Sequence, residues 1–173
     1  MIFLRHPKPK IAPGVCYGRS DIGLTESATS EIAAAVKRLP RIGHLVSSPA
    51  TRCQRLASAI ARYHGVTLQT DPSLAELDFG RWELCHWDEI PRTESDPWAA
   101  DPWRVAPPGG ETFAQLHARL GAALADLSED AVIVTHAGPI RAAKMLLTGA
   151  SFADVFAEKI PYAIPLALNR SAA

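Results

Sequence analysis

The chain has 173 residues, 47% of them hydrophobic, which suffices for one domain (1–173) with a buried core. Its 18 basic and 18 acidic residues balance, so no overall positive field favours a nucleic acid or an anionic membrane surface as a partner. The three cysteines lie far apart, and the apolar run after Met1 is too short for a signal peptide or a membrane span. These features predict a cytoplasmic protein with reduced thiols.

The chain begins with an apolar run at 1–4 that predicts a short buried strand. Pro7 lacks an N–H group and restricts the residue before it, so Arg5 and His6 are expected at the carboxyl end of this strand. Apolar residues at helical spacing then predict a first helix from a cap at Thr25 to Leu39, ahead of Pro40.

A second strand is predicted over 44–47, followed by a helix with Ser48 as its cap and Pro49 as its first residue. Arg52 is then expected in the first turns of this helix, near the carboxyl end of the strand. A third strand is predicted over 66–69.

The segment 71–110 has many prolines and no sustained periodicity, which predicts an irregular cap. It contains all four tryptophans: Trp82, Trp87, Trp98 and Trp103. A capping-box pattern at Thr112 and Gln115 and an apolar stripe predict a helix that continues to Leu127.

The run 131–135 is the strongest signal for a buried strand, and it leads directly into His136. Pro139 is expected to begin another helix, 151–154 to cap a short last helix, and 164–168 to form an edge strand. Strands that alternate with helices predict an α/β fold of three layers, α/β/α, with a mostly parallel central sheet and a small cap over the strand carboxyl ends.

Four polar residues are thereby predicted at one edge of the sheet: Arg5, His6, Arg52 and His136. In open α/β sheets ligands bind outside the strand carboxyl ends, and guanidinium groups suit the oxygens of a phosphoryl group. A histidine held unprotonated by nearby arginines can attack phosphorus. From the residues alone, this anion site and an ordinary α/β domain with polar loops remain open alternatives.

Four motifs in order along nearly the whole chain resemble the histidine phosphatase superfamily, which has the phosphoglycerate-mutase-like fold. They lie at Leu4-Arg5-His6, at 47–52, at 74–83 and at 134–138. The resemblance implies that His6 is phosphorylated, that Arg5, Arg52 and His136 hold the phosphoryl oxygens, and that Glu76 protonates the leaving alcohol and then activates water. It implies hydrolysis of a small phosphorylated metabolite without a metal or another cofactor.

The segments 13–24 and 108–112 are similar to the α-ribazole phosphatase-related branch, which implies a nucleotide-like phosphate as substrate. Tyr17, Arg19 and Ala137 are then expected to bind the substrate. The cap tryptophans are expected to stack on a ring of the leaving group, with simple packing or a homodimer interface as alternatives.

Three further functional classes are open at this point. A phosphoglycerate-mutase-type transferase would use the same residues, although the cap is short for that activity. A degenerate protein that only binds phosphate would fit the departures from the family pattern at Pro7, Ala137 and Leu84, where glycine is usual. A metal hydrolase would need ligands beyond His6 and His136, and the arginines beside them would repel a cation.

Overall fold

The computed structural model describes residues 1–170. Its sheet has the order β3-β2-β4-β1-β5, and only β5 runs antiparallel to its neighbour. The strands are β1 Ile2–Arg5, β2 Leu45–Ser47, β3 Leu68–Thr70, β4 Val132–Thr135 and β5 Leu166–Ala167. The helices are α1 Ala28–Arg38, α2 Thr51–His64, α3 Arg92–Ala100, α4 Phe113–Ala125, α5 Ala137–Thr148 and α6 Phe152–Ala157.

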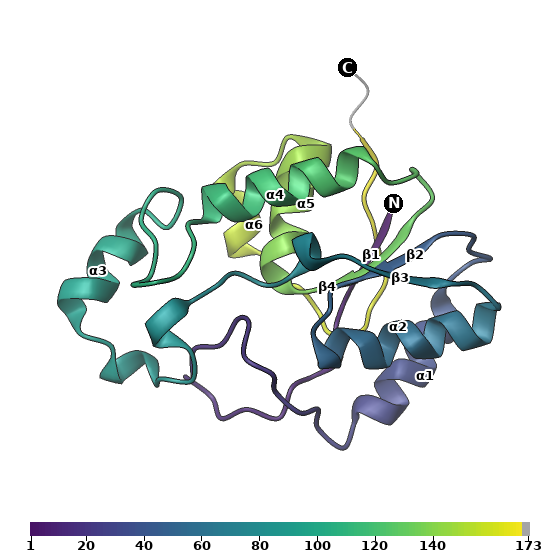
Figure 1. Cartoon of the computed structure of the whole chain (residues 1–173), viewed down its shortest axis with the longest axis horizontal. Helices are drawn as coiled ribbons and strands as arrows, with labels where there is room; N and C mark the ends of the chain where they lie inside the picture. The colour runs from purple at the N-terminus through teal and green to yellow at the C-terminus, as the bar shows by residue number, and fades with distance from the viewer. Residues whose placement is uncertain (171–173) are drawn as a thin grey trace.

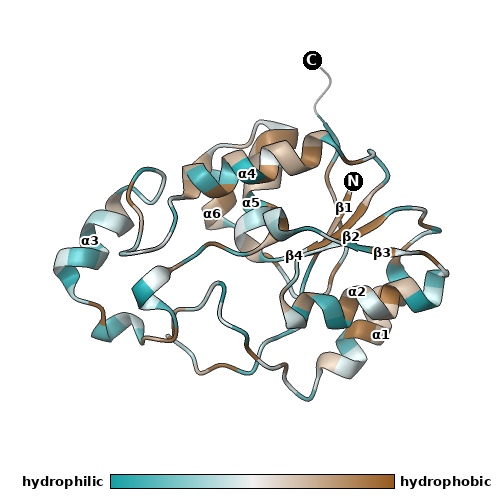
Figure 2. Ribbon diagram, in the orientation of Figure 1, coloured by the Kyte–Doolittle hydropathy of each residue, from teal (hydrophilic) through white to brown (hydrophobic). Residues whose placement is uncertain are grey.

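Helices cover both faces of the sheet (Figure 1). Side chains alternate along each strand, so Phe3 and Ile133 pack against α4 and α5, whereas Leu4 and Val132 pack against α1 and α2. Figure 2 shows the central strands β1, β2 and β4 as largely hydrophobic, as expected for strands buried on both faces, whereas the edge strand β3 is half-buried to exposed. The predicted three-layer α/β/α fold with a mostly parallel sheet is confirmed.

The register of the three central strands places the polar residues that follow them at one edge. Arg5 pairs with Thr135, and Ser47 pairs with Val134, so β1, β2 and β4 end at the same level. Residues directly after these strands therefore meet, whatever their separation along the chain.

The cap over this edge contains more regular structure than the sequence predicts. Within 71–110 lie three short 3-10 helices, η1 Pro72–Leu74, η2 Gly80–Trp82 and η3 Trp87–Glu89, together with α3. The prediction missed α3 because Pro97 stands inside it and its residues are mainly polar and half-buried or exposed. Figure 1 shows α3 projecting away from the sheet.

Three predicted helix starts are wrong. Helix α2 begins at Thr51 after Ala50, without a side-chain cap; the Ser48 hydroxyl accepts from the Ala50 N–H ahead of the helix and contacts His136. Helix α5 begins at Ala137 rather than at Pro139, and α1 at Ala28 rather than next to Thr25. The capping box of Thr112 on α4 is present as predicted. Within residues 1–170 no helix is long and apolar enough to cross a membrane.

Candidate active site

His6 follows β1 and is held by its backbone and by its ring. Its N–H donates to the Thr135 carbonyl at 2.9 Å, which extends the pairing of β1 with β4 by one residue. The ring is only 1% exposed, and its Nδ1 lies 2.7 Å from the Pro7 carbonyl oxygen. Because a carbonyl can only accept, Nδ1 carries the hydrogen and Nε2 keeps a free lone pair. Pro7 therefore still supplies the contact that orients the ring.

The surroundings keep the His6 ring neutral. The pKa of His6 is lowered to about 3, mainly by burial and to a lesser extent by the positive charges of Arg52 and Arg5, while the Pro7 hydrogen bond acts in the opposite direction. The sequence predicted a lowered pKa from the arginines; in the structure burial is the larger cause. An unprotonated imidazole is the form that can act as a nucleophile.

Arg52 and His136 lie beside His6 and are completely buried. The rings of His6 and His136 meet edge to face, with centroids 5.2 Å apart. Arg52 lies in the first turn of α2, and its Nη2 is 3.2 Å from Nδ1 of His136. The Ser48 hydroxyl is 2.8 Å from Nε2 of the same ring, so both ring nitrogens have a partner. Burial, together with the neighbouring positive groups, lowers the pKa of His136 well below its usual value.

Arg5 is half-buried and completes the group at the sheet edge. Its Nη1 donates to the Ile160 carbonyl at 2.9 Å, and its guanidinium lies 3.9 Å from the centroid of the Tyr162 ring. Within residues 1–170, the Nε atoms of both Arg5 and Arg52 are buried without a hydrogen-bond partner. Arg52 lines the first of the two cavities described below and Arg5 the second, so each places a cationic group beside a cavity at this edge.

Glu76 lies across from these residues, after η1. Its Oε1 accepts from the backbone N–H of Leu77 and of Gly138, each at 3.0 Å. A Cβ atom on Gly138 would lie 2.2 Å from Oε1, so a larger residue at this position of α5 would displace the carboxylate from its present place. The first turn of α5 therefore sets the place of Glu76.

A cavity of about 590 Å³ opens at this edge of the sheet. Glu76, Arg52 and His136 line it, together with polar residues of the loops and of α4. Of the three residues expected to bind substrate, Arg19 lines this cavity and Tyr17 lines a second one. Ala137 is buried and lines neither; the adjacent Gly138 lines the second cavity.

Sequence reasoning assigned no role to Glu83, which holds the loop beneath Arg52. Its carboxylate accepts from the backbone N–H groups of Gly18 (3.0 Å), Arg19 (2.8 Å) and Ser20 (3.1 Å), and from the Ser20 hydroxyl (2.6 Å). Burial raises the pKa of Glu83, but these hydrogen bonds together bring it below its usual value. The carbonyls of Gly18 and Ser20 in turn accept from Arg52. The only signal in the sequence was the motif containing Glu83.

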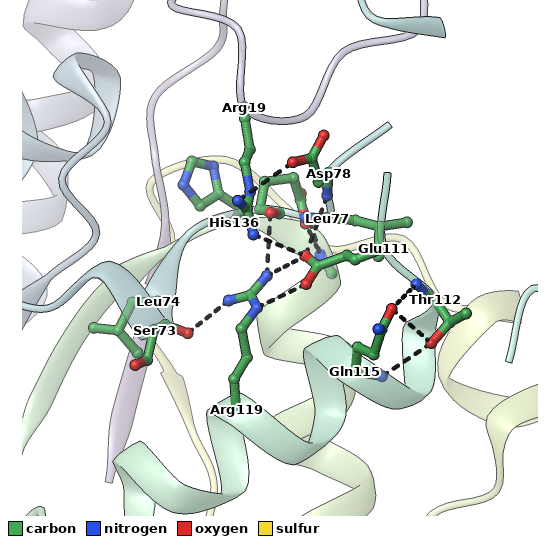
Figure 3. A network of polar contacts seen from close by, with 12 residues as sticks. Arg19, Ser73, Leu74, Leu77, Asp78, Glu111, Thr112, Gln115, Arg119 and His136 are labelled. Carbon is green, nitrogen blue, oxygen red and sulfur yellow. Dashed lines mark hydrogen bonds and ion pairs between the residues drawn. The ribbon is translucent and has the colours of Figure 1, made fainter. Parts of the chain in front are cut away.

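A second unforeseen network holds the backbone at Glu76 (Figure 3). Arg119 on α4 donates to the Glu76 carbonyl at 3.1 Å and to the Ser73 carbonyl at 2.7 Å. Glu111 pairs with Arg119 at 2.6 Å and with Arg19 at 3.4 Å. Arg119 adjoins the apolar stripe of its helix, so periodicity alone could not reveal this role.

Comparison of the sequence with known proteins shows which family the chain belongs to. The sequence model of the histidine phosphatase superfamily (branch 1) matches residues 1–166. The chain belongs to this superfamily. The predicted resemblance is thereby confirmed over nearly the whole chain.

Among curated relatives, a bifunctional protein of Mycobacterium tuberculosis is 34% identical over 122 residues, which are 65% of this chain and 33% of that protein. A probable phosphoglycerate mutase of an Enterobacter species is 32% identical over 117 residues, which are 63% of this chain and 53% of that protein. The chain thus spans about a third to a half of the length of these relatives.

Solved structures share the fold at lower identity. An α-ribazole phosphatase of Shigella flexneri superimposes with a TM-score of 0.85 at 20% identity, covering 95% of this chain and 87% of that one. A mycobacterial glucosyl-3-phosphoglycerate phosphatase gives a TM-score of 0.79 at 23% identity, covering 91% and 82%. These likenesses show the common fold, within which different phosphate esters are substrates.

Proposed function

We propose that the protein hydrolyses phosphate monoesters of small metabolites through a phosphohistidine on His6. The observation that carries the proposal is a neutral His6 ring, oriented by Pro7, at the same sheet edge as the positive charges of Arg5 and Arg52. Phosphoryl transfer needs a positioned nucleophile and fixed cationic donors for the phosphoryl oxygens. We assign these roles to residues of this edge, with His6 as the nucleophile and Arg5 and Arg52 as the donors.

In the first step, Nε2 of His6 forms a bond to phosphorus as the bond from phosphorus to the ester oxygen breaks. The carboxylic acid of Glu76 donates its proton to the departing oxygen, so a neutral alcohol leaves. In the second step, water attacks the phosphohistidine, the Glu76 carboxylate takes a proton from that water, and the bond from nitrogen to phosphorus breaks. Inorganic phosphate is released, and His6 and Glu76 return to their starting states.

No step of this scheme uses a metal ion. Within residues 1–170, no group of three or more histidine, cysteine, aspartate or glutamate side chains is placed to hold one. Arg5 and Arg52 beside the two histidines also oppose a cation, as the sequence had suggested. Metal independence is therefore part of the proposal and is tested with a chelator.

α-Ribazole phosphate is a candidate substrate. Support comes from the segments 13–24 and 108–112 and from the fold shared with an α-ribazole phosphatase. A transferase is the second candidate, supported by the similarity to a probable phosphoglycerate mutase. The two activities differ in product, because a mutase returns the phosphoryl group to a second hydroxyl whereas a phosphatase releases inorganic phosphate.

The test is release of phosphate from an aryl phosphate and from α-ribazole phosphate in EDTA, with 3-phosphoglycerate as the mutase substrate. His6→Ala and the milder His6→Asn should each lose on the order of 10⁴-fold or more in kcat, because both remove the nucleophile. Acid-labile phosphohistidine should be trapped in the wild type and absent from both variants. His44→Ala, a histidine at the opposite end of β2 that contacts Ser128 and Gln69, is the matched control and should retain activity.

Turnover that depended on a metal, or that survived both His6 substitutions in folded protein, would overturn the proposal. Isomerisation of a phosphoglycerate without phosphate release would replace it with the transferase. Binding of phosphate without turnover of any of these substrates would leave the protein a binding module.

A further inference from the structure

Glu76 lies on a segment without regular structure of its own. The short helix η1 ends at Leu74, and residues 75–79 belong to no helix or strand. Backbone outside helices and strands must find other partners for its N–H and C=O groups. Whatever holds this backbone therefore decides where the carboxyl group of Glu76 can reach.

Arg119 supplies two such partners from α4 (Figure 3). Its Nη1 donates to the Ser73 carbonyl at 2.7 Å, and its Nη2 donates to the carbonyl of Glu76 itself at 3.1 Å. Helix α4 is anchored in the core by Leu116 and Leu120, which are fully buried. The guanidinium of Arg119 thus connects the segment that carries Glu76 to a packed helix.

Glu111 holds the same segment on the other side of Glu76. Its two carboxylate oxygens accept from Nη2 of Arg119 at 2.6 Å and from Nε at 3.1 Å, which forms a two-pronged ion pair. Oε1 of Glu111 also accepts from the Asp78 N–H at 3.1 Å, and the Glu111 N–H donates to the Asp78 carbonyl at 3.0 Å. The pair therefore holds the carbonyl of residue 76 and both backbone groups of residue 78.

This pair differs from the ion pairs of the surface. The side chains of Arg119 and Glu111 are only 20% and 13% exposed, whereas those of Arg92 and Asp96 on α3 are 87% and 59% exposed. Burial removes hydration from both charges, so such a pair is weak evidence for a role in stability. The geometry that it imposes on the backbone at Glu76 is the more informative feature.

We infer that Arg119, itself oriented by Glu111, is a positioning residue that sets the reach of the general acid Glu76. The inference rests on the proposed hydrolysis. A displacement of about 1 Å can cost on the order of 100-fold in rate, so a fixed backbone is important for proton donation. Arg119 also lines the first cavity, so the test must separate this role from direct contact with the substrate.

The two roles differ in how they depend on the leaving alcohol. Benzyl phosphate releases a weakly acidic alcohol, whose oxygen needs a proton as it departs, whereas 2,4-dinitrophenyl phosphate releases a phenolate that is stable without one. The ratio kcat/KM reports the first chemical step, in which this proton is given. The value of kcat also contains the attack of water, in which Glu76 serves every ester alike, so kcat/KM is the quantity to compare.

Two variants test the role of the guanidinium. Arg119→Met keeps the apolar stem alone, and Arg119→Lys keeps the charge but replaces the fork with a single ammonium group. For benzyl phosphate, kcat/KM should fall by about 30- to 100-fold in Arg119→Met and by about 5- to 10-fold in Arg119→Lys. For 2,4-dinitrophenyl phosphate, the loss should stay below about 3-fold in both variants.

Two further variants calibrate this pattern. Glu76→Gln removes the acid itself and should show the same selective loss on benzyl phosphate. Once the acid is gone there is no proton to position, so adding Arg119→Met to Glu76→Gln should cost less than about 3-fold more on this ester. Arg92→Met, which breaks the exposed pair with Asp96, is the matched control and should leave kcat/KM for both esters unchanged.

Hydrogen exchange provides a measurement that does not depend on turnover. A peptide that covers residues 73–78 should exchange its amide hydrogens faster in Arg119→Met than in the wild type, because the Arg119 contacts hold this backbone. Its exchange in Arg92→Met should match that of the wild type.

Equal losses on both esters in the folded Arg119 variants would assign Arg119 to substrate binding or to the fold and overturn the inference, while the phosphatase stands. Full additivity with Glu76→Gln, or unchanged exchange of residues 73–78, would also overturn it. A Glu76→Gln variant that affects both esters equally would instead overturn the role of Glu76 in the proposed function. Wild-type protein that hydrolyses neither ester would overturn that function as a whole, whatever Arg119→Met does to hydrogen exchange.

Discussion

The sheet edge and the cap hold their functional side chains by different means. At the sheet edge, His6, Arg52 and His136 follow neighbouring parallel strands or begin the helix after one, and all three are buried. In the cap, the backbone is held by hydrogen bonds between loops and by side-chain carboxylates such as Glu83 and Glu111, and Trp87, Trp98 and Trp103 stay half-buried. Strand register fixes the first region, whereas individual loop contacts fix the second.

The two regions correspond to two parts of a phosphate ester. In the proposed reaction the sheet edge binds the phosphoryl group, and the cap lies toward the alcohol portion. A phosphoryl group is common to every phosphate ester, so its site can be built into the sheet. The alcohol portion differs from one ester to another, and loops can change without disturbing the sheet. Changes at the edge should therefore alter kcat for all esters alike, and changes in the cap should alter the choice among them.

The largest expected effect is that of Gly138→Ala, which tests the sheet edge. The new Cβ would lie 2.2 Å from Oε1 of Glu76, a flexible side-chain end that can move aside, and 3.2 Å from a methyl group of Leu116. If Glu76 is the general acid as proposed, its displacement should reduce kcat by roughly 10- to 100-fold for every ester. The free energy of unfolding should change little, because the higher helix propensity of alanine, about 1 kcal/mol over glycine, offsets the close contact with Leu116.

Gly121→Ala on α4 is the matched control, since its Cβ would make only an ordinary contact of 3.6 Å with Leu146. Steady-state kinetics and thermal unfolding of both variants provide the measurement. Wild-type kcat in Gly138→Ala would show that the position of Glu76 does not limit the reaction.

The same contrast explains how much of the molecule the sequence predicted. Short apolar runs ended by polar residues or proline located β1, β2 and β4, and parallel pairing then placed His6 and His136 together. Glu83 could not be placed in the same way, because its partners lie 63–65 residues away in an irregular loop. Periodicity carries no information about such contacts, which depend on how two loops cross.

Burial of His6 at the sheet edge should make stability depend on pH. The pKa of His6 is about 3 in the folded protein, and its usual value of 6.5 applies to the unfolded chain. Between pH 3 and pH 6.5 the unfolded chain therefore binds more protons than the folded protein. The free energy of unfolding should fall as the pH falls through this range, and His6 should contribute about 1.4 kcal/mol per pH unit.

Urea unfolding of the wild type and His6→Gln between pH 4 and 8 measures this contribution. The variant should show the shallower slope below about pH 6, and the two slopes should agree above about pH 7.5, where neither state binds a proton at residue 6. Equal slopes at acid pH would mean that His6 is protonated in the folded protein, which would contradict its assignment as a neutral nucleophile.

The smallest expected effect concerns the cap, where the departure from glycine at Leu84 has a structural consequence. Leu84 has a φ of 66° and is 60% exposed, so a strained backbone supports a side chain that buries little. This conformation costs a residue with a side chain about 1–2 kcal/mol, and the greater freedom of glycine in the unfolded chain offsets part of the gain. Leu84→Gly should therefore stabilise the protein by about 0.5 kcal/mol, or raise Tm by about 1–2 °C.

Leu84→Ala separates backbone strain from loss of the side chain, because alanine keeps the strained conformation. Its Tm should stay near that of the wild type, below that of Leu84→Gly. A lower Tm for both variants would mean that the exposed leucine contributes packing that outweighs the strain. A higher Tm for Leu84→Gly alone, with unchanged kcat on an aryl phosphate, would show that this turn of the cap can change without altering the sheet edge. This result is expected if the two regions are independent.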